Sequence, residues 1–145
     1  MITRIPTYRA KTIKQNFTKK EYRKDKSLVK INGIFYIIGV VVSFCNQIES
    51  ITNGVIYSYE KETLSINFQG MKGTDNKPIF ASLSEDGKGG DICYIAGKGL
   101  CYITFDLDGA YANIIENNLN IFDDLFPLRE ALYENDIKQV TGIQQ

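Results

Sequence analysis

The stretch that decides the fold runs from residue 27 to residue 44 and reads Ser27-Leu-Val-Lys-Ile-Asn-Gly-Ile-Phe-Tyr-Ile-Ile-Gly-Val-Val-Val-Ser-Phe44. Asn32-Gly33 separates two β-prone runs, and this pair favours a type I′ turn because both residues tolerate positive φ angles. In the run from Ile34 to Phe44, β-branched and aromatic residues occupy both sets of alternating positions, one on each face of the strand. This pattern is typical of a strand that is covered on both faces. The stretch therefore predicts a hairpin whose second arm is a central strand.

Shorter segments on the C-terminal side also indicate strands. Residues 64–68 alternate between apolar and polar side chains and predict a half-buried strand. Residues 110–115 and 137–143 predict two more strands, whereas the Gly-containing segments 70–78 and 84–90 predict loops, the second of them flexible. Many short strands with closely spaced turns indicate a mainly β chain that forms a barrel or a barrel-like sheet.

Two of the three cysteines belong to a further predicted hairpin. Residues 91–96 and 100–105 flank a Gly-Lys-Gly turn, and a loop of residues 96–98 would place Cys93 opposite Cys101. Two thiols alone rarely form a metal site, so we expect both to be core residues.

Helical signals are weak. Residues 121–134 show some helical apolar spacing that Pro127 interrupts, which predicts one or two short helical turns. The basic segment 11–26 has little apolar periodicity, and we expect it to be a loop or an exposed strand.

The composition argues against an enzyme and against a secreted or membrane protein. The chain has 145 residues and no histidine, so neither a Ser-His-Asp triad nor a His-ligated zinc site is available. We therefore expect no catalytic residue, no metal and no cofactor. Three cysteines, a polar and basic N-terminus and a longest apolar run of about a dozen residues predict a cytoplasmic protein that does not enter a membrane.

A net charge of zero conceals a steep gradient along the chain. Residues 1–30 carry a net charge of +8, residues 31–105 carry −2, and residues 106–145 carry −6. Three arrangements fit this gradient: the two ends pack together in one fold, they pair between subunits, or one end contacts a charged partner.

The central stretch contains a dense motif, Phe68-Gln-Gly-Met-Lys-Gly-Thr-Asp-Asn-Lys-Pro-Ile-Phe80 followed by Gly90-Asp-Ile-Cys93. This motif resembles the YopX family, with thinner likenesses at Tyr8-Arg9-Ala10, 27–38, 99–112 and 137–143. The resemblance implies a small protein of phages or integrated elements that forms homo-oligomers and has no established biochemical activity. It also implies an SH3-like β barrel in the C-terminal half. We accordingly expect an N-terminal β region at residues 1–63 and the barrel at 64–145, with its short helical segment near 121–134.

The dense motif has a structural interpretation. Glycines permit tight or left-handed turns, Asp-Asn suits a turn in which a side chain binds nearby amides, and an aspartate directly before a strand can accept hydrogen bonds from loop N–H groups. The residues with this predicted architectural role are Gly70, Gly73, Asp75, Asn76, Gly90 and Asp91.

Two functions remain after these exclusions. The first is an accessory protein that acts through protein contacts and self-associates, with its natural partners unidentified. The alternative is a nucleic-acid-binding module, because basic side chains neutralise phosphates and the segment also carries aromatic residues that can stack on bases. The candidate nucleic-acid-binding residues are Arg9, Lys11, Lys19, Lys20, Arg23 and Lys24.

Overall fold

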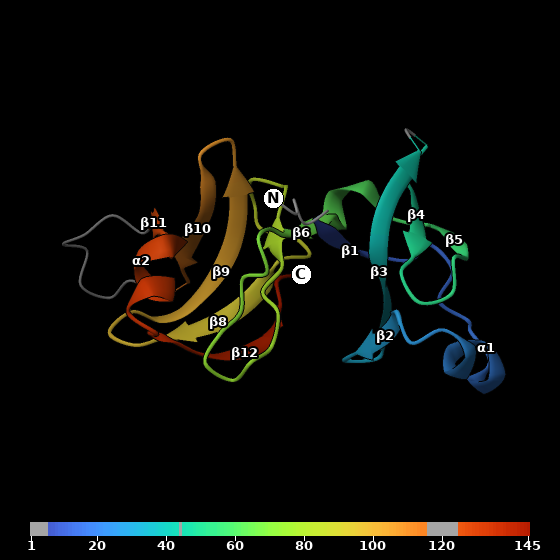
Figure 1. Ribbon diagram of the computed structural model, residues 1–145, viewed down its shortest axis with the longest axis horizontal. Coiled ribbons are helices and arrows are strands. Elements are labelled where there is room, and N and C mark those ends of the chain that lie inside the picture. The colour runs from blue at the N-terminus through green and yellow to red at the C-terminus, as the bar shows by residue number, and fades with distance from the viewer. Residues whose placement is uncertain (1–5, 44, 116–124) are drawn as a thin grey trace, which may run out of the picture.

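The computed structural model describes residues 6–43, 45–115 and 125–145, which are mainly β and form one open sheet with two short helices (Figure 1). The strands are β1 (Thr7–Lys11), β2 (Leu28–Ile31), β3 (Ile34–Ser43), β4 (Gln47–Ser50), β5 (Ile56–Ser58), β6 (Ser65–Asn67), β7 (Ala81–Ser82), β8 (Asp91–Ile95), β9 (Gly99–Asp106), β10 (Gly109–Ile114), β11 (Leu125–Pro127) and β12 (Ile137–Ile143). The helices are α1 (Lys19–Lys24), α2 (Leu128–Tyr133) and the short 3-10 helix η1 (Lys61–Thr63).

The hairpin predicted around Asn32-Gly33 is confirmed. Asn32 and Gly33 have φ angles of 52° and 81°, and β2 and β3 pair in register on either side of them. β3 is central to the N-terminal part of the sheet, since it pairs with β1, β2 and β4. At Gly39 the neighbouring strand comes so close that an added Cβ would collide with the Glu49 carbonyl oxygen, which explains the glycine in this apolar run.

Several C-terminal elements are also confirmed. β8 and β9 form the predicted hairpin, in which Cys93 lies directly opposite Cys101 and both side chains are fully buried. β12 spans residues 137–143, as predicted. The prediction for residues 64–68 was wrong in one respect: β6 is buried on both faces, since Ser65, Ile66 and Asn67 are all buried.

The described strands do not close into the SH3-like barrel that the resemblance implied. The main path of the sheet runs β11-β10-β9-β7-β6-β1-β3-β4-β5, with β2 pairing β3 and with β8 joining β9 to β12. This path ends at β11 and at β5, so the sheet is open. β11 itself ends at Pro127, whose nitrogen carries no hydrogen, and the chain continues directly into α2.

One of the two α-helices differs from the sequence predictions and the other agrees with them. Segment 11–26 contains α1, which begins with a capping box in which Thr18 accepts a hydrogen bond from the Glu21 N–H and the Glu21 side chain binds the Thr18 N–H. In the C-terminal segment, α2 (Leu128–Tyr133) confirms a short helical segment within residues 121–134, and it follows the short strand β11, which was not predicted. Residues 121–124 of that prediction lie outside the described residues.

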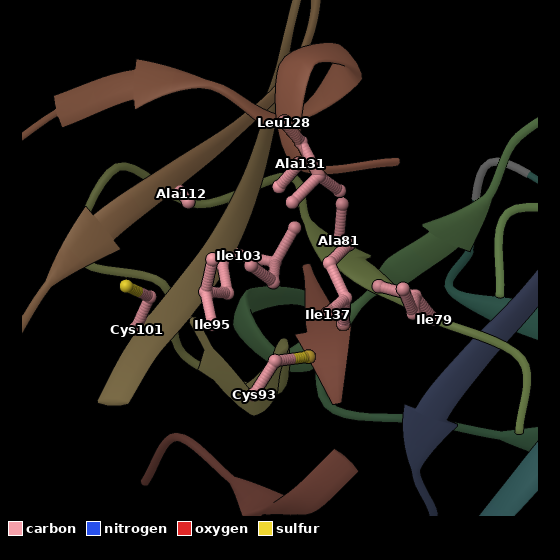
Figure 2. Packing of buried hydrophobic residues seen from close by; sticks show 10 residues of the cluster. All are labelled: Ile79, Ala81, Cys93, Ile95, Cys101, Ile103, Ala112, Leu128, Ala131 and Ile137. Carbon is pink, nitrogen blue, oxygen red and sulfur yellow. The ribbon is translucent and has the colours of Figure 1, made fainter. Parts of the chain in front are cut away.

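Two apolar clusters form the interior. The N-terminal cluster contains Ala10 of β1, Ile37 of β3, Ile48 of β4 and Tyr59, which directly follows β5. In the C-terminal cluster, Leu128 and Ala131 of α2 reach toward Ile103 of β9 (Figure 2). The division of the chain at residue 63 stays a prediction. Within the described ranges, no helix has the length and apolar character required to cross a membrane.

Candidate functional site

A buried ion pair joins the two parts of the sheet. Arg9 projects from β1 and Asp91 is the first residue of β8, and the Arg9 Nη2 atom lies 2.8 Å from Asp91 Oδ1. Arg9 is 5% exposed and Asp91 is 1% exposed. These two residues belong to separate segments of the family resemblance, Tyr8-Arg9-Ala10 and Gly90-Asp91, which the fold brings into contact.

Backbone groups and aromatic rings complete the surroundings of the pair. Arg9 Nη2 donates a hydrogen bond to the Gly89 carbonyl at 2.9 Å, and Asp91 Oδ2 accepts one from the Phe80 N–H at 2.8 Å. The guanidinium carbon lies 4.6 Å from the centroid of the Phe80 ring and 5.8 Å from that of Tyr36. Arg9 Nε and Asp91 Oδ1 have no aligned hydrogen-bond partner among the described residues.

The electrostatics of the pair favour a structural role. Burial raises the pKa of Asp91, and the charge of Arg9 opposes that shift. Arginine does not lose its proton in proteins, so Arg9 keeps its charge at neutral pH and acts as a fixed counter-ion of Asp91. Removing either member would leave an uncompensated charge in the interior, a change that typically costs about 3–5 kcal/mol.

The six predicted motif residues form two groups. Gly90 directly precedes β8 and Asp91 is its first residue. A Cβ at residue 90 would collide with the Ile103 carbonyl oxygen and would lie 2.9 Å from the Ser82 nitrogen. The Asp91 N–H donates to the Phe80 carbonyl, and the Gly90 carbonyl accepts from the Gln144 N–H, both at 2.8 Å. This group fastens β8 to β7 and to the end of the chain.

The second group is the turn before β7, and it fastens that turn to β12. Gly70 and Asn76 have φ angles of 69° and 65°. Asp75 accepts hydrogen bonds from the Lys77 N–H at 3.1 Å and from the Val140 N–H at 3.0 Å. Burial pushes the pKa of Asp75 upward, but these bonds outweigh burial and lower it. A glycine suits position 73 because the Cβ of any other residue would lie only 2.9 Å from Asp75 Oδ1, which is too close.

A groove of about 440 Å³ lies beside the ion pair. Its lining includes Arg9, Asp91 and Lys77, and most of the remaining lining side chains are apolar. Val29 and Ile31 of β2 line one side, and residues 140–143 of β12 line the other.

The structure separates the six basic residues that were candidates for nucleic-acid binding. Arg9 is buried in the pair with Asp91, and Lys11 lies 3.6 Å from Glu60. The other four are exposed on α1 and have no ion pair with any residue that the structure describes: Lys19, Lys20, Arg23 and Lys24.

Sequence analysis missed a second buried carboxylate, that of Asp25 directly after α1. Its side chain is 1% exposed and accepts hydrogen bonds from the hydroxyls of Ser50, Thr52 and Tyr57 at 2.7–3.0 Å, and from the Ser27 N–H at 3.0 Å. Burial acts to raise the pKa of Asp25, but the four donors outweigh it and the pKa is lowered. Burial also raises the pKa of Tyr57 to about 12, so its hydroxyl stays protonated and able to donate.

The described residues do not assemble a recognisable catalytic centre. Burial raises the pKa of the Cys93 thiol above its usual value and that of Cys101 to about 11, which opposes formation of a nucleophilic thiolate. In the part of the chain that the structure describes, His, Cys, Asp and Glu side chains do not gather in groups of three or more that could hold a metal ion.

The Asp25 network predicts a pH-dependent contribution to stability. We expect Asp25→Asn to lower the free energy of unfolding at neutral pH by about 1–3 kcal/mol, because the carboxylate acceptor of four donors is lost. The folded-state pKa lies below the unfolded value of about 3.9, so this contribution is present above pH 4 and is lost as the pH falls through the folded-state pKa.

Urea unfolding from pH 7 to pH 3 measures this effect as the difference between the wild type and Asp25→Asn. Asp108→Asn, which changes an exposed carboxylate, serves as the control and should show no such difference. A gap between the wild type and Asp25→Asn that stays constant, or widens, as the pH falls would contradict the role assigned to this carboxylate.

Comparison of the chain with protein-family models, with curated proteins and with solved structures gave no match. The resemblance to the YopX family therefore depends on the motif at residues 68–93 and the thinner likenesses around it alone.

Proposed function

We propose that this chain is a non-catalytic accessory protein of a phage or integrated element, and that it acts through protein contacts and self-associates end to end. One observation carries the self-association. The basic α1 and the acidic region of α2 lie at opposite ends of the longest axis of the molecule (Figure 1). The two ends therefore do not neutralise each other within one chain.

The basic end is a helix with unbalanced charge. Lys19 and Arg23, and likewise Lys20 and Lys24, are separated by four residues, and like charges at this spacing destabilise a helix. The capping box and the contact of the Tyr22 ring with Phe35, at 5.5 Å between centroids, hold the helix in place. A negatively charged surface from another molecule would relieve the repulsion.

The acidic end offers such a surface. Glu130, Glu134 and Asp136 line a hollow of about 550 Å³ beside α2, together with Lys98 and Arg129. Residues 106–145 as a whole carry a net charge of −6. The charged residues that line the hollow carry a net charge of −1, so the complementarity to α1 comes mainly from the net charge of residues 106–145 as a whole. Such complementarity favours specific and rapid association more than tight binding.

Opposite ends imply a particular type of assembly. When the basic end of one copy binds the acidic end of the next, the first copy keeps an unused acidic end and the second keeps an unused basic end. Such head-to-tail contacts generate rings or open chains. The assembly should consequently grow with protein concentration and dissociate as salt screens the charges.

Light scattering tests this proposal through mass and salt dependence. At low salt we expect a mass above the 16.4 kDa of one chain that rises with concentration and falls toward 16.4 kDa at high salt. Lys20→Glu/Lys24→Glu should give monomers, as should Glu130→Lys/Glu134→Lys, and an equimolar mixture of the two variants should associate again.

The matched control is Lys61→Glu/Lys72→Glu, which changes the net charge as much as the α1 variant does but at exposed sites outside α1. This control should associate like the wild type. A monomer at every salt concentration, or an oligomer whose mass does not respond to salt, would rule out charge-driven association.

The alternative function, binding of single-stranded nucleic acid through α1, is favoured by Tyr22. The residue is 38% exposed and lies among the four exposed cations of the helix, an arrangement suited to phosphate contacts and base stacking. Filter binding across a salt series would then show affinity that falls steeply with salt. Lys20→Glu/Lys24→Glu should abolish binding, whereas Glu130→Lys/Glu134→Lys should preserve it. Absence of binding at low salt would exclude this alternative.

A further inference from the structure

Of the two strands that border the groove beside Arg9 and Asp91, β2 has a free edge, whereas the outer edge of β12 is bonded to the turn at Thr74 and Asp75. Among the described residues, β2 pairs only with β3, and β12 pairs only with β8. A continuous path of paired strands, β2-β3-β1-β6-β7-β9-β8-β12, connects them and curls so that its two ends lie on opposite sides of the groove. In Figure 1, β2 and β12 lie on the same lower side of the molecule.

The free edge of β2 presents unpaired backbone groups. The Ile38 N–H donates a hydrogen bond to the Ser27 carbonyl at 2.9 Å, so the backbone of Ser27 faces β3. Because the backbone of every second residue faces the same neighbouring strand, Val29 and Ile31 also face β3. The backbone of Lys30 therefore points away from β3, and neither its N–H nor its carbonyl has a hydrogen-bond partner among the described residues. Such an edge is a template for an added strand.

The side chains beside this edge are suited to apolar contacts. Val29 and Ile31 project into the groove, where Val140 and Ile143 of β12 lie on the other side. The buried guanidinium and carboxylate line the same groove, and each retains an atom without an aligned hydrogen-bond partner among the described residues, Arg9 Nε and Asp91 Oδ1. A strand added to β2 would place alternate side chains in this space.

We propose that the groove binds an extended segment of another protein, which adds to the sheet beside β2. The segment carries apolar side chains at the positions that enter the groove and an acidic side chain at the position beside Lys30. This is strand addition, in which main-chain hydrogen bonds give affinity and the alternate side chains give specificity.

Charge identifies the occupant. Lys30 is exposed at the middle of the β2 edge and Lys77 lines the groove, whereas the charge of Arg9 is neutralised by Asp91. An acidic segment complements these two lysines. A second copy is disfavoured, since its β2 would bring another Lys30 to the same edge and like charges on adjacent strands oppose pairing. This surface is separate from α1 and α2, so it goes beyond the self-association proposed above.

Fluorescence anisotropy with two labelled peptides tests the proposal. We expect the full chain to bind Val-Glu-Val-Glu-Val saturably and to bind Val-Lys-Val-Lys-Val at least about tenfold more weakly. Lys30→Glu should reverse this preference. Lys61→Glu, an exposed lysine outside the groove, should leave it unchanged.

A second variant tests the groove itself. Gly142 lines the groove, and a Cβ added there meets no atom within 4 Å, so Gly142→Val should fold normally, occupy the groove and abolish binding of both peptides. Circular dichroism and thermal unfolding check the fold of each variant. The proposal is overturned if neither peptide binds the wild type, or if binding persists unchanged in both Lys30→Glu and Gly142→Val. It is equally overturned if Gly142→Val breaks a dimer of the chain, because a second copy would then occupy the groove.

Discussion

An arginine and an aspartate that face each other in the interior, far apart in sequence, set the geometry of this molecule. The Arg9–Asp91 pair connects β1, which borders the N-terminal apolar cluster, to β8, which borders the C-terminal one. Each charge is costly to bury alone, and together with the Gly89 carbonyl and the Phe80 N–H they largely satisfy each other. The position of β12 beside β2, and with it the groove, depends on this connection.

The proposed functions depend on charged side chains and backbone groups that have no partner among the described residues. Asp25, with its four donors, and Asp75, with two N–H donors, have several hydrogen-bond partners within the chain. The cations of α1, the carboxylates beside α2 and the edge of β2 lack such partners within the described residues. These three surfaces differ in chemistry, because two are charged and one combines apolar side chains with open backbone groups. A chain of this kind is suited to contacts with other macromolecules.

Local signals predicted local structure. The Asn32-Gly33 turn, the Cys93–Cys101 register and the span of β12 followed from turn chemistry and side-chain alternation. α1 was missed although Thr18 and Glu21 form a recognisable capping box, because the helix has only six residues and buries none of them. The open sheet, β11 and the Asp25 network depend on contacts between distant segments, which no local pattern encodes. Arg9 and Asp91 both lay within motif segments, yet Arg9 was interpreted as a surface cation because its partner is remote in sequence.

A double-mutant cycle on the ion pair tests the central claim most directly. Urea unfolding of Arg9→Met, Asp91→Asn and the double variant gives the coupling free energy between the two side chains. Each single variant should lose about 3–5 kcal/mol of stability. The double variant should lose less than the sum of the two, by about 1–3 kcal/mol. Losses that simply add, within about 0.5 kcal/mol, would show that the two charges do not depend on each other and would contradict this account of the fold.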